Sequence, residues 1–216
     1  MKFLRLLLVL QAVYMLTACS MSGVKEEPVE KIDWQQHQQR VNDFKHWSIS
    51  GRIALQSEYE GGQADYVWKQ AGDTDYDIRL QAPMGAGTTL IRGRFDGVTL
   101  QTSSGDMMFD TDVDKLVSEF NGWPLPVSGL HYWVRGLPSP DRRFKVAKWH
   151  ANGLPYVIIQ DGWRIEFLRH KKISGYLLPE KLFISRQRGD EIDVRLIIRQ
   201  WSVDEVNAIQ RSVENV

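Results

Sequence analysis

The chain has 216 residues, of which 43% are hydrophobic and 25% are charged, and this composition indicates a folded globular protein rather than a disordered one. Its 27 basic residues balance its 27 acidic residues, so the chain lacks the long-range field that would gather DNA, RNA or acidic ligands. We therefore expect no nucleic-acid partner. The length of the chain is sufficient for a buried core in one domain or at most two.

The N-terminus has the layout of a secretory signal peptide. Lys2 and Arg5 form a short basic region, and an apolar stretch follows over residues 6–16. That stretch is shorter than the roughly 20 apolar residues that a membrane-spanning helix needs. It ends in "LTAC", which resembles a bacterial lipobox. We predict that residues 1–18 are removed and that acyl chains are attached to Cys19.

Cys19 is the only cysteine in the chain, so no disulfide bond can form within it. The alternative is an ordinary cleaved signal peptide that happens to end in a cysteine. Ser20 follows the cysteine, where an Asp would suggest retention at the inner membrane, so the lipobox favours the outer membrane. Residues 19–32 are predicted to be a lipidated N-terminus and a flexible tether of about a dozen residues.

Residues 33–45 are predicted to form a helix with one apolar stripe. Asp33 is a credible N-cap for it. The residues of the stripe are spaced by three and four positions, and they are Trp34, His37, Val41 and Phe44.

From Trp47 onward the hydrophobic period changes to two. The segments "WSISGRIAL", "ADYVW" and "YDIRL" alternate in the way that is typical of half-buried antiparallel strands. Five strand-favouring segments come later: "RFKVAKW", "PYVIIQ", "GWRIEFL", "KLFISR" and "IDVRLIIRQW". Turn sequences such as "EYEGG", "AGDTD" and "FDGV" separate the earlier segments. The sequence therefore predicts a mainly β (α+β) fold, with about eleven strands in one curling antiparallel sheet.

Two short helices are predicted to interrupt this sheet. The first covers residues 111–121 and opens with a capping box made of Thr111 and Asp114. The second follows Pro126 and ends at Gly136. Its apolar face consists of Leu130, Trp133 and Val134. The tail, residues 204–216, is compatible with a short helix or with no fixed structure.

The sequence contains few patterns that are typical of catalytic or metal-binding sites. No two of the five histidines stand at the i, i+4 spacing of a helical metal site, and the chain contains no nucleophile elbow, Walker A or dinucleotide-binding pattern. We therefore predict no catalytic residue, no metal and no cofactor other than a covalent lipid on Cys19. A surface-tethered hydrolase would need a paired acid and base, which the sequence does not identify.

The aromatic content is high, with eight Trp, seven Tyr and eight Phe. Most of these residues are expected to fill a core. A strongly curved antiparallel sheet can also enclose a hollow, and a hollow lined by such residues would accept acyl chains. A second feature is the apolar tip of "APMGAG", where Met84 stands between Pro83 and Gly85 on an expected tight loop. An exposed methionine there suggests an apolar contact partner.

Four segments together resemble the outer-membrane lipoprotein receptor family LolB. They are "NGWPLPVSGLHYWVRGLP", "LQAPMGAGTTL", the lipobox and "IIRQW". The resemblance covers Cys19 to about Val203. Its pattern residues in the central segment are Gly122, Pro124, Pro126, Leu130, Trp133, Gly136, Leu137 and Pro138.

The resemblance implies both a fold and a function. The fold would be an incomplete, strongly curved antiparallel β-barrel of about eleven strands, formed by residues 33–203. Helices would cover one mouth of the barrel, and the protein would be a monomer. The protein would sit at the periplasmic face of the outer membrane, anchored by its lipid. It would accept acylated lipoproteins from the periplasmic carrier LolA, hold their acyl chains in an apolar cavity, and insert them into outer-membrane lipid. The alternative is a non-enzymatic envelope scaffold with a solid core.

The resemblance also assigns residues. Pro83, Met84 and Gly85 match the family's membrane-insertion loop, with Met84 at the position of its usual Leu, a volume-conserving change. The strand alternation and the helix stripes supply candidates for the cavity lining. They are Ile53, Leu55, Trp68, Ile78, Leu80, Leu90, Phe120, Leu130 and Trp133.

Overall fold

The structure is a computed structural model that describes residues 30–58, 60–121, 125–186 and 191–203. Cys19, the proposed tether up to residue 29 and the tail 204–216 lie outside the described residues. The predictions made for them remain predictions.

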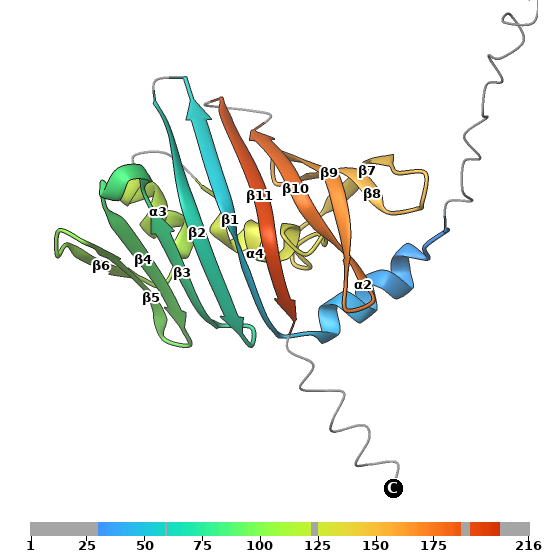
Figure 1. The fold of residues 1–216 in the computed structure, drawn as a ribbon, viewed down its shortest axis with the longest axis horizontal. Coiled ribbons are helices and arrows are strands. Elements are labelled where there is room, and N and C mark those ends of the chain that lie inside the picture. Colours follow the sequence, from blue (N-terminus) through green and yellow to red (C-terminus); the bar gives the residue numbers. More distant parts are fainter. Residues whose placement is uncertain (1–29, 59, 122–124, 187–190, 204–216) are drawn as a thin grey trace, which may run out of the picture. The chain divides into compact units, whose positions relative to one another are not determined.

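Eleven strands form one antiparallel sheet in the order β6-β5-β4-β3-β2-β1-β11-β10-β9-β8-β7 (Figure 1). The strands are β1 (His46–Ser57), β2 (Gly61–Ala71), β3 (Asp75–Gln81), β4 (Thr88–Arg94), β5 (Gly97–Thr102), β6 (Met107–Asp110), β7 (Phe144–Trp149), β8 (Pro155–Gln160), β9 (Trp163–Ile173), β10 (Tyr176–Arg186) and β11 (Ile192–Val203). Every neighbouring pair except β1 and β11 is consecutive in the sequence. Because β6 and β7 are edges and do not pair with each other, the barrel is incomplete, and the predicted fold class is confirmed.

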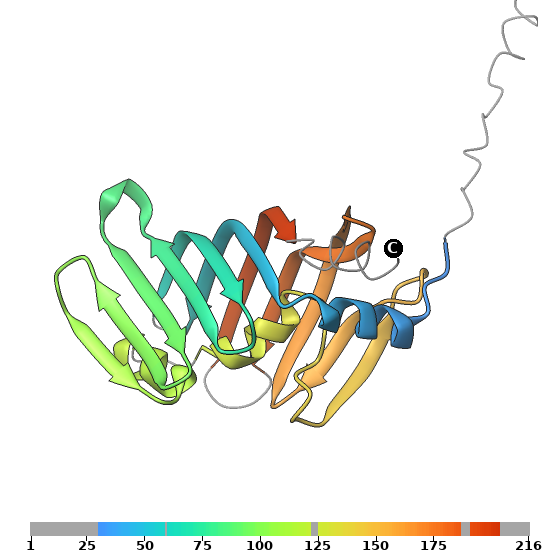
Figure 2. The ribbon, with the colours of Figure 1, turned by 90° about the horizontal axis from the view of Figure 1, so that it is seen from below.

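The sheet curls strongly (Figure 2). A register shift between Ser50 and Gly51 marks a β-bulge where β1 pairs with β11, and a bulge bends and twists the strands that carry it. A Cβ atom added at Gly51 would lie 1.9 Å from the carbonyl oxygen of Ile197. Only glycine therefore permits the close approach of the two central strands at this point.

The first helix, α2 (Trp34–Asp43), confirms the prediction for residues 33–45. A side-chain oxygen of Asp33 accepts a hydrogen bond from the backbone N–H of Gln36 at 3.1 Å, which is an N-cap. The helix packs on the turn between β9 and β10. There the guanidinium carbon of Arg40 lies 5.1 Å from the ring centre of Tyr176, and Arg40 donates to the carbonyl of Gly175 at 3.4 Å.

The predicted capping box of the next helix, α3 (Val113–Asn121), is wrong. Asp112 is the cap, because its side chain accepts from the backbone N–H of Asp114 at 2.9 Å and of Lys115 at 3.2 Å. The carboxylate of Asp114 instead accepts from the backbone N–H of Ser128 at 2.9 Å and from the Ser128 hydroxyl. Asp114 therefore joins α3 to the first turn of α4, and its burial there raises its pKa.

The third helix, α4 (Val127–Trp133), lies along the concave side of the sheet, beneath its central strands (Figures 1 and 2). The predicted apolar face is confirmed, since Leu130, Trp133 and Val134 are all buried. The chain turns away at Gly136, whose φ of +79° is in the left-handed region that glycine favours.

The core is densest under β8 to β11. There Ile158, Ile165, Phe167, Leu182 and Ile184 each have 0% of their surface exposed. These large side chains are completely enclosed, so the interior is closely packed around them. Among the described residues, no helix has the length and hydropathy needed to cross a membrane.

Candidate functional site

One row of inward side chains runs across the strands β1 to β5. The strand registers place neighbouring members of the row opposite each other, in the order Ile49, Trp68, Ile78, Ile91 and Leu100. All five are buried. Because each strand alternates with period two, the residues two positions along each strand form a second inward row beside the first.

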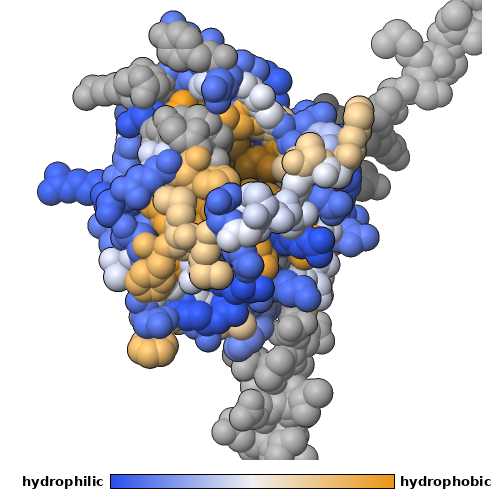
Figure 3. Space-filling model, turned by 90° about the vertical axis from the view of Figure 1, so that its left-hand side faces the viewer, coloured by the Kyte–Doolittle hydropathy of each residue, from blue (hydrophilic) through white to orange (hydrophobic). Residues whose placement is uncertain are grey.

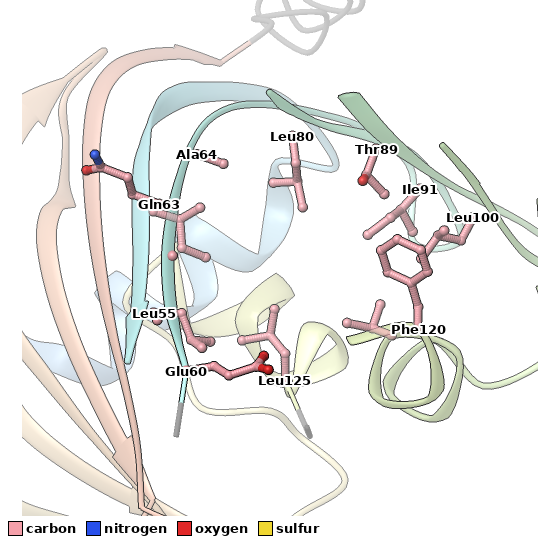
Figure 4. A pocket seen from close by; sticks show the side chains of 14 residues that line it. Leu55, Glu60, Gln63, Ala64, Leu80, Thr89, Ile91, Leu100, Phe120 and Leu125 are labelled. Carbon is pink, nitrogen blue, oxygen red and sulfur yellow. The ribbon is translucent and has the colours of Figure 1, made fainter. Parts of the chain in front are cut away.

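The side chains nearer the β1–β2 turn are smaller, and a cavity of about 430 Å³ lies against them (Figure 4). Leu55 is paired with Gly62, and Ile53 with Ala64. On the facing side, Leu80 is paired with Thr89. A glycine and an alanine opposite two aliphatic residues leave space that larger side chains would occupy.

Helix α3 and the segment before α4 border the cavity with apolar side chains. Val117 and Phe120 come from α3, and Leu125 precedes α4. Viewed from the β6 side, the molecule has a hollow with hydrophobic side chains inside it, and both hydrophobic and polar residues lie on the surface around it (Figure 3). The volume lies within the about 300–1,000 Å³ that is usual for small-molecule sites.

A second, smaller space of about 50 Å³ adjoins the first. The two share four lining residues, which are Ile53, Leu80, Ile91 and Leu125. The smaller space reaches inward to Trp68 and Leu130, and no polar side chain other than the Tyr66 and Trp68 rings lines it. The site is therefore a hollow that opens outward and narrows into an apolar cleft above α4.

Most of the predicted lining residues meet at this hollow. Ile53, Leu55, Leu80 and Phe120 line its wide part. Trp68, Ile78 and Leu130 line its narrow part together with Ile53 and Leu80. Their placement agrees with the prediction, while their role in binding acyl chains remains a prediction.

Two of the predicted lining residues are elsewhere, and this part of the prediction is wrong. Leu90 is paired with Arg79 and Gln101 on the outer face of the sheet, because its neighbour Ile91 takes the inward position. Trp133 lies on the side of α4 that faces away from the hollow. Its indole N–H donates to Gln160 Oε1 at 2.9 Å, and its ring packs near that of Trp163.

The sequence interpretation missed several residues of the lining. They are Glu60, Gly62, Ala64, Gly61, Gln63, Thr89, Ile91, Leu100, Val117 and Leu125. Spacing could have identified the first three. Glu60, Gly62 and Ala64 continue, at every second position, the series of inward residues that includes Tyr66 and Trp68 of β2. The sequence "EYEGG" predicts a turn, and this prediction places the start of the strand too late.

The loop that carries Met84 adjoins the hollow. It is a short 3-10 turn, η2 (Pro83–Gly85), between β3 and β4. Leu80, near the end of β3, and Thr89, near the start of β4, both line the hollow. Its closure is fixed by a hydrogen bond of 3.0 Å from Ala82 N–H to the carbonyl of Gly87. Met84 has a φ of 54°, and its side chain is fully exposed.

A buried polar cluster lies at the other end of β2. The carbonyl oxygen of the Gln70 side chain accepts from the Trp68 indole N–H at 3.0 Å and lies 3.2 Å from Nδ1 of His131 on α4. Burial lowers the pKa of His131 to about 3, so the ring is neutral at physiological pH and Nδ1–H can donate to Gln70. This cluster fixes α4 to the sheet beneath the hollow.

Charged pairs lie away from the hollow. Arg52 contacts Asp65 at 3.0 Å and Arg94 contacts Asp77 at 2.9 Å, both on exposed positions. In the part of the chain that the structure describes, no group of three or more His, Cys, Asp or Glu side chains is arranged to hold a metal ion. The lining of the hollow is mainly apolar, and such a surface can bind apolar groups by burial.

The comparisons with known proteins agree with this arrangement. The family model of the outer membrane lipoprotein LolB matches residues 45–201. The chain is 34% identical over 202 residues to the outer-membrane lipoprotein LolB of Pseudomonas syringae pv. syringae, covering 92% of this chain and 96% of that protein. It is 36% identical over 201 residues to the corresponding protein of Alkalilimnicola ehrlichii, covering 92% and 97%.

Solved structures with low sequence identity share the fold. A DUF1329 family protein from Desulfovibrio piger superimposes with a TM-score of 0.51 at 8% identity, covering 78% of this chain and 90% of that one. A LolA superfamily protein from Nitrosomonas europaea gives a TM-score of 0.50 at 7% identity, covering 82% and 96%. The family match covers β1 to β10, β11 as far as Trp201, and both helices that border the hollow, and the chain therefore belongs to the LolB family of outer-membrane lipoproteins.

Proposed function

We propose that this protein is a lipid-anchored receptor of the outer membrane, which accepts acylated lipoproteins from the periplasmic carrier LolA and inserts them into the membrane. Membership of the LolB family supports the general part of the proposal, a role in outer-membrane lipoprotein localisation. The observation that carries the specific part is the apolar hollow of about 430 Å³ beside the loop of Met84.

Acyl chains would occupy the hollow because its wall is apolar. Burying apolar surface contributes about 25 cal/mol per Å², or about 0.8 kcal/mol for each methylene that leaves water. A few methylenes held in the narrow part between Trp68 and Leu130 would therefore set the affinity. Direction would follow from a ranking of affinities, since each tenfold step needs only about 1.4 kcal/mol.

Anchoring and delivery would be separate tasks. The acyl groups on Cys19 would hold the protein at the membrane, with about 0.8 kcal/mol for each buried methylene. Met84 would touch the bilayer next to the mouth of the hollow. Its burial contributes roughly 1.5–3 kcal/mol, which suits a reversible contact and is too little for an anchor.

A transfer assay tests the proposal. Carrier loaded with a labelled lipoprotein is mixed with this protein in its lipidated form and then with liposomes, and the label is followed from carrier to receptor to liposome. The proposal expects label on the receptor first and on the liposomes later. Label that stays on the carrier, or reaches liposomes equally fast without the protein, would contradict it and would favour a scaffold.

The anchor is tested separately by a Cys19→Ala variant. We expect it to lose its membrane association on cell fractionation while its folded domain still binds acyl chains. A variant that stays in the outer-membrane fraction would refute the assignment of Cys19.

A further inference from the structure

Among the described residues that line the wide part of the hollow, Glu60 has the only ionisable side chain. It lies in the turn between β1 and β2, and its position alternates with Gly62 and Ala64, which also line the hollow. In Figure 4 its carboxylate is directed into the hollow on the side of Leu125. The mouth of an otherwise uncharged site therefore carries a negative charge.

The turn holds the backbone of Glu60 in place. The backbone N–H of Ser57 donates to the Glu60 carbonyl at 2.7 Å, and the Glu60 N–H donates to the Ser57 hydroxyl at 3.0 Å. None of the ion pairs found among the described residues includes Glu60. Its charge is thus not neutralised by a described cation, and no Lys or Arg lines this hollow to attract an anion.

The facing wall is polar without being charged. Thr89 lies opposite Leu80, and its hydroxyl points toward the hollow in Figure 4. A hydroxyl can donate to or accept from an amide or an ester. An acyl chain joined to an uncharged group would therefore meet a compatible surface at the mouth, whereas a chain that ends in an anion would meet the carboxylate of Glu60.

We propose that Glu60 is a specificity-determining residue that acts as a charge filter. It admits acyl chains linked through neutral amide or ester groups, and it disfavours chains that carry an anionic head, such as fatty-acid anions and anionic phospholipids. This inference rests on the proposed acyl-binding function and adds to it a reason why anionic lipids would compete weakly with cargo for the hollow.

The expected effect is moderate because Glu60 is exposed. Repulsion between like charges about 6 Å apart corresponds to about threefold weaker binding of an anion at the dielectric constant of water, and to about tenfold at roughly half that value. Salt should reduce the discrimination, because the Debye length falls from about 10 Å at 0.1 M to about 3 Å at 1 M.

The test uses two probes with the same acyl chain and a fluorophore at its far end, one with a primary amide head and the other with a carboxylate. At neutral pH only the second is charged. The full-length protein is compared with Glu60→Gln and with the control Glu58→Gln, which removes the same charge from an exposed residue of the same turn that does not line the hollow.

We expect Glu60→Gln to strengthen binding of the carboxylate probe about three- to tenfold and to leave binding of the amide probe within about twofold. Glu58→Gln should change neither by more than about twofold. Equal gains in the two variants, or no gain in Glu60→Gln while the amide probe still binds, would overturn the charge filter alone. Absence of saturable amide-probe binding to the wild type would overturn the proposed function as well.

Discussion

The two halves of the sheet follow the same alternating pattern but pack differently. In the hollow half, β1 to β6, the inward positions near the β1–β2 turn include Gly62, Ala64 and Thr89, and a cavity lies against them. In the filled half, β7 to β11, residues such as Phe167 and Leu182 are completely enclosed. A period of two fixes which residues face inward, while the sizes of those residues decide whether the interior is full or hollow.

The filled half should carry most of the stability. We expect Phe167→Ala to lower the free energy of unfolding by about 3–5 kcal/mol, because it opens a void in a closely packed region. Leu55→Ala in the hollow half should cost only about 1 kcal/mol, since its side chain already borders open space. Urea denaturation of both variants measures the difference. Equal losses would mean that the two halves are packed alike.

The loop beside the hollow half should matter for delivery and not for stability. Met84→Glu should slow delivery into liposomes about ten- to a hundredfold, the loss of roughly 1.5–3 kcal/mol of apolar contact. A matched control is Phe95→Glu, which places the same charge on an exposed apolar residue at the opposite end of β4. Equal slowing by both variants would indicate general repulsion from the membrane, and normal delivery by Met84→Glu would exclude the insertion role.

Acid should destabilise both halves through buried histidines. Burial lowers the pKa of His131, beneath the hollow half, to about 3 and that of His170, in the filled half, to about 4. Both values lie below the unfolded value of 6.5, so the unfolded state binds more protons once the pH falls below about 6.5. Stability is therefore complete above that pH and is lost as the pH drops toward the folded values.

Between about pH 7 and pH 5 we expect a loss of about 1–2 kcal/mol for each of these histidines. Urea midpoints of His131→Gln and His170→Gln, measured at both pH values, distinguish the contributions of the two halves. Each variant should lose the part of the pH-dependent stability that its own histidine contributes. A wild-type stability that is unchanged at the lower pH would contradict the burial of both rings.

Filling the hollow should weaken acyl binding with only a small effect on folding. Ala64→Phe points a large ring into the cavity, and we expect at least about tenfold weaker binding of a neutral acyl probe, with a change in unfolding free energy of no more than about 1 kcal/mol. Val67→Phe is the control, because Val67 is an exposed residue on the outer face of the same strand and does not line the hollow. Unchanged binding in Ala64→Phe would place the acyl site elsewhere.

Local patterns were sufficient to predict most of the fold. Alternation identified the strands, and spacings of three and four identified the stripes of α2 and α4, because a side chain's direction follows directly from the period of its element. The capping box failed since Thr111, Asp112 and Asp114 all have capping side chains, and the choice among them depends on Asp114 reaching Ser128 on another helix. That contact is tertiary and leaves no local signature.

The hollow itself was harder to predict. Leu90 and Ile91 are adjacent and both apolar, so composition alone could not decide which of them faces inward. Trp133 shares the buried stripe of α4 with Leu130, yet the partner that draws it away, Gln160, is 27 residues distant. Space between elements depends on small residues such as Gly62 and Ala64, which a search for large apolar residues passes over.

The central claim is that acyl chains enter the hollow half alone, and methyl NMR with a spin-labelled neutral acyl chain tests it most directly. We expect selective broadening of the methyl signals of Leu55, Leu80 and Leu100, which line the hollow, and sharp signals from Leu178 and Leu182 in the filled half. Uniform broadening, broadening confined to the filled half, or none at saturating probe would contradict it.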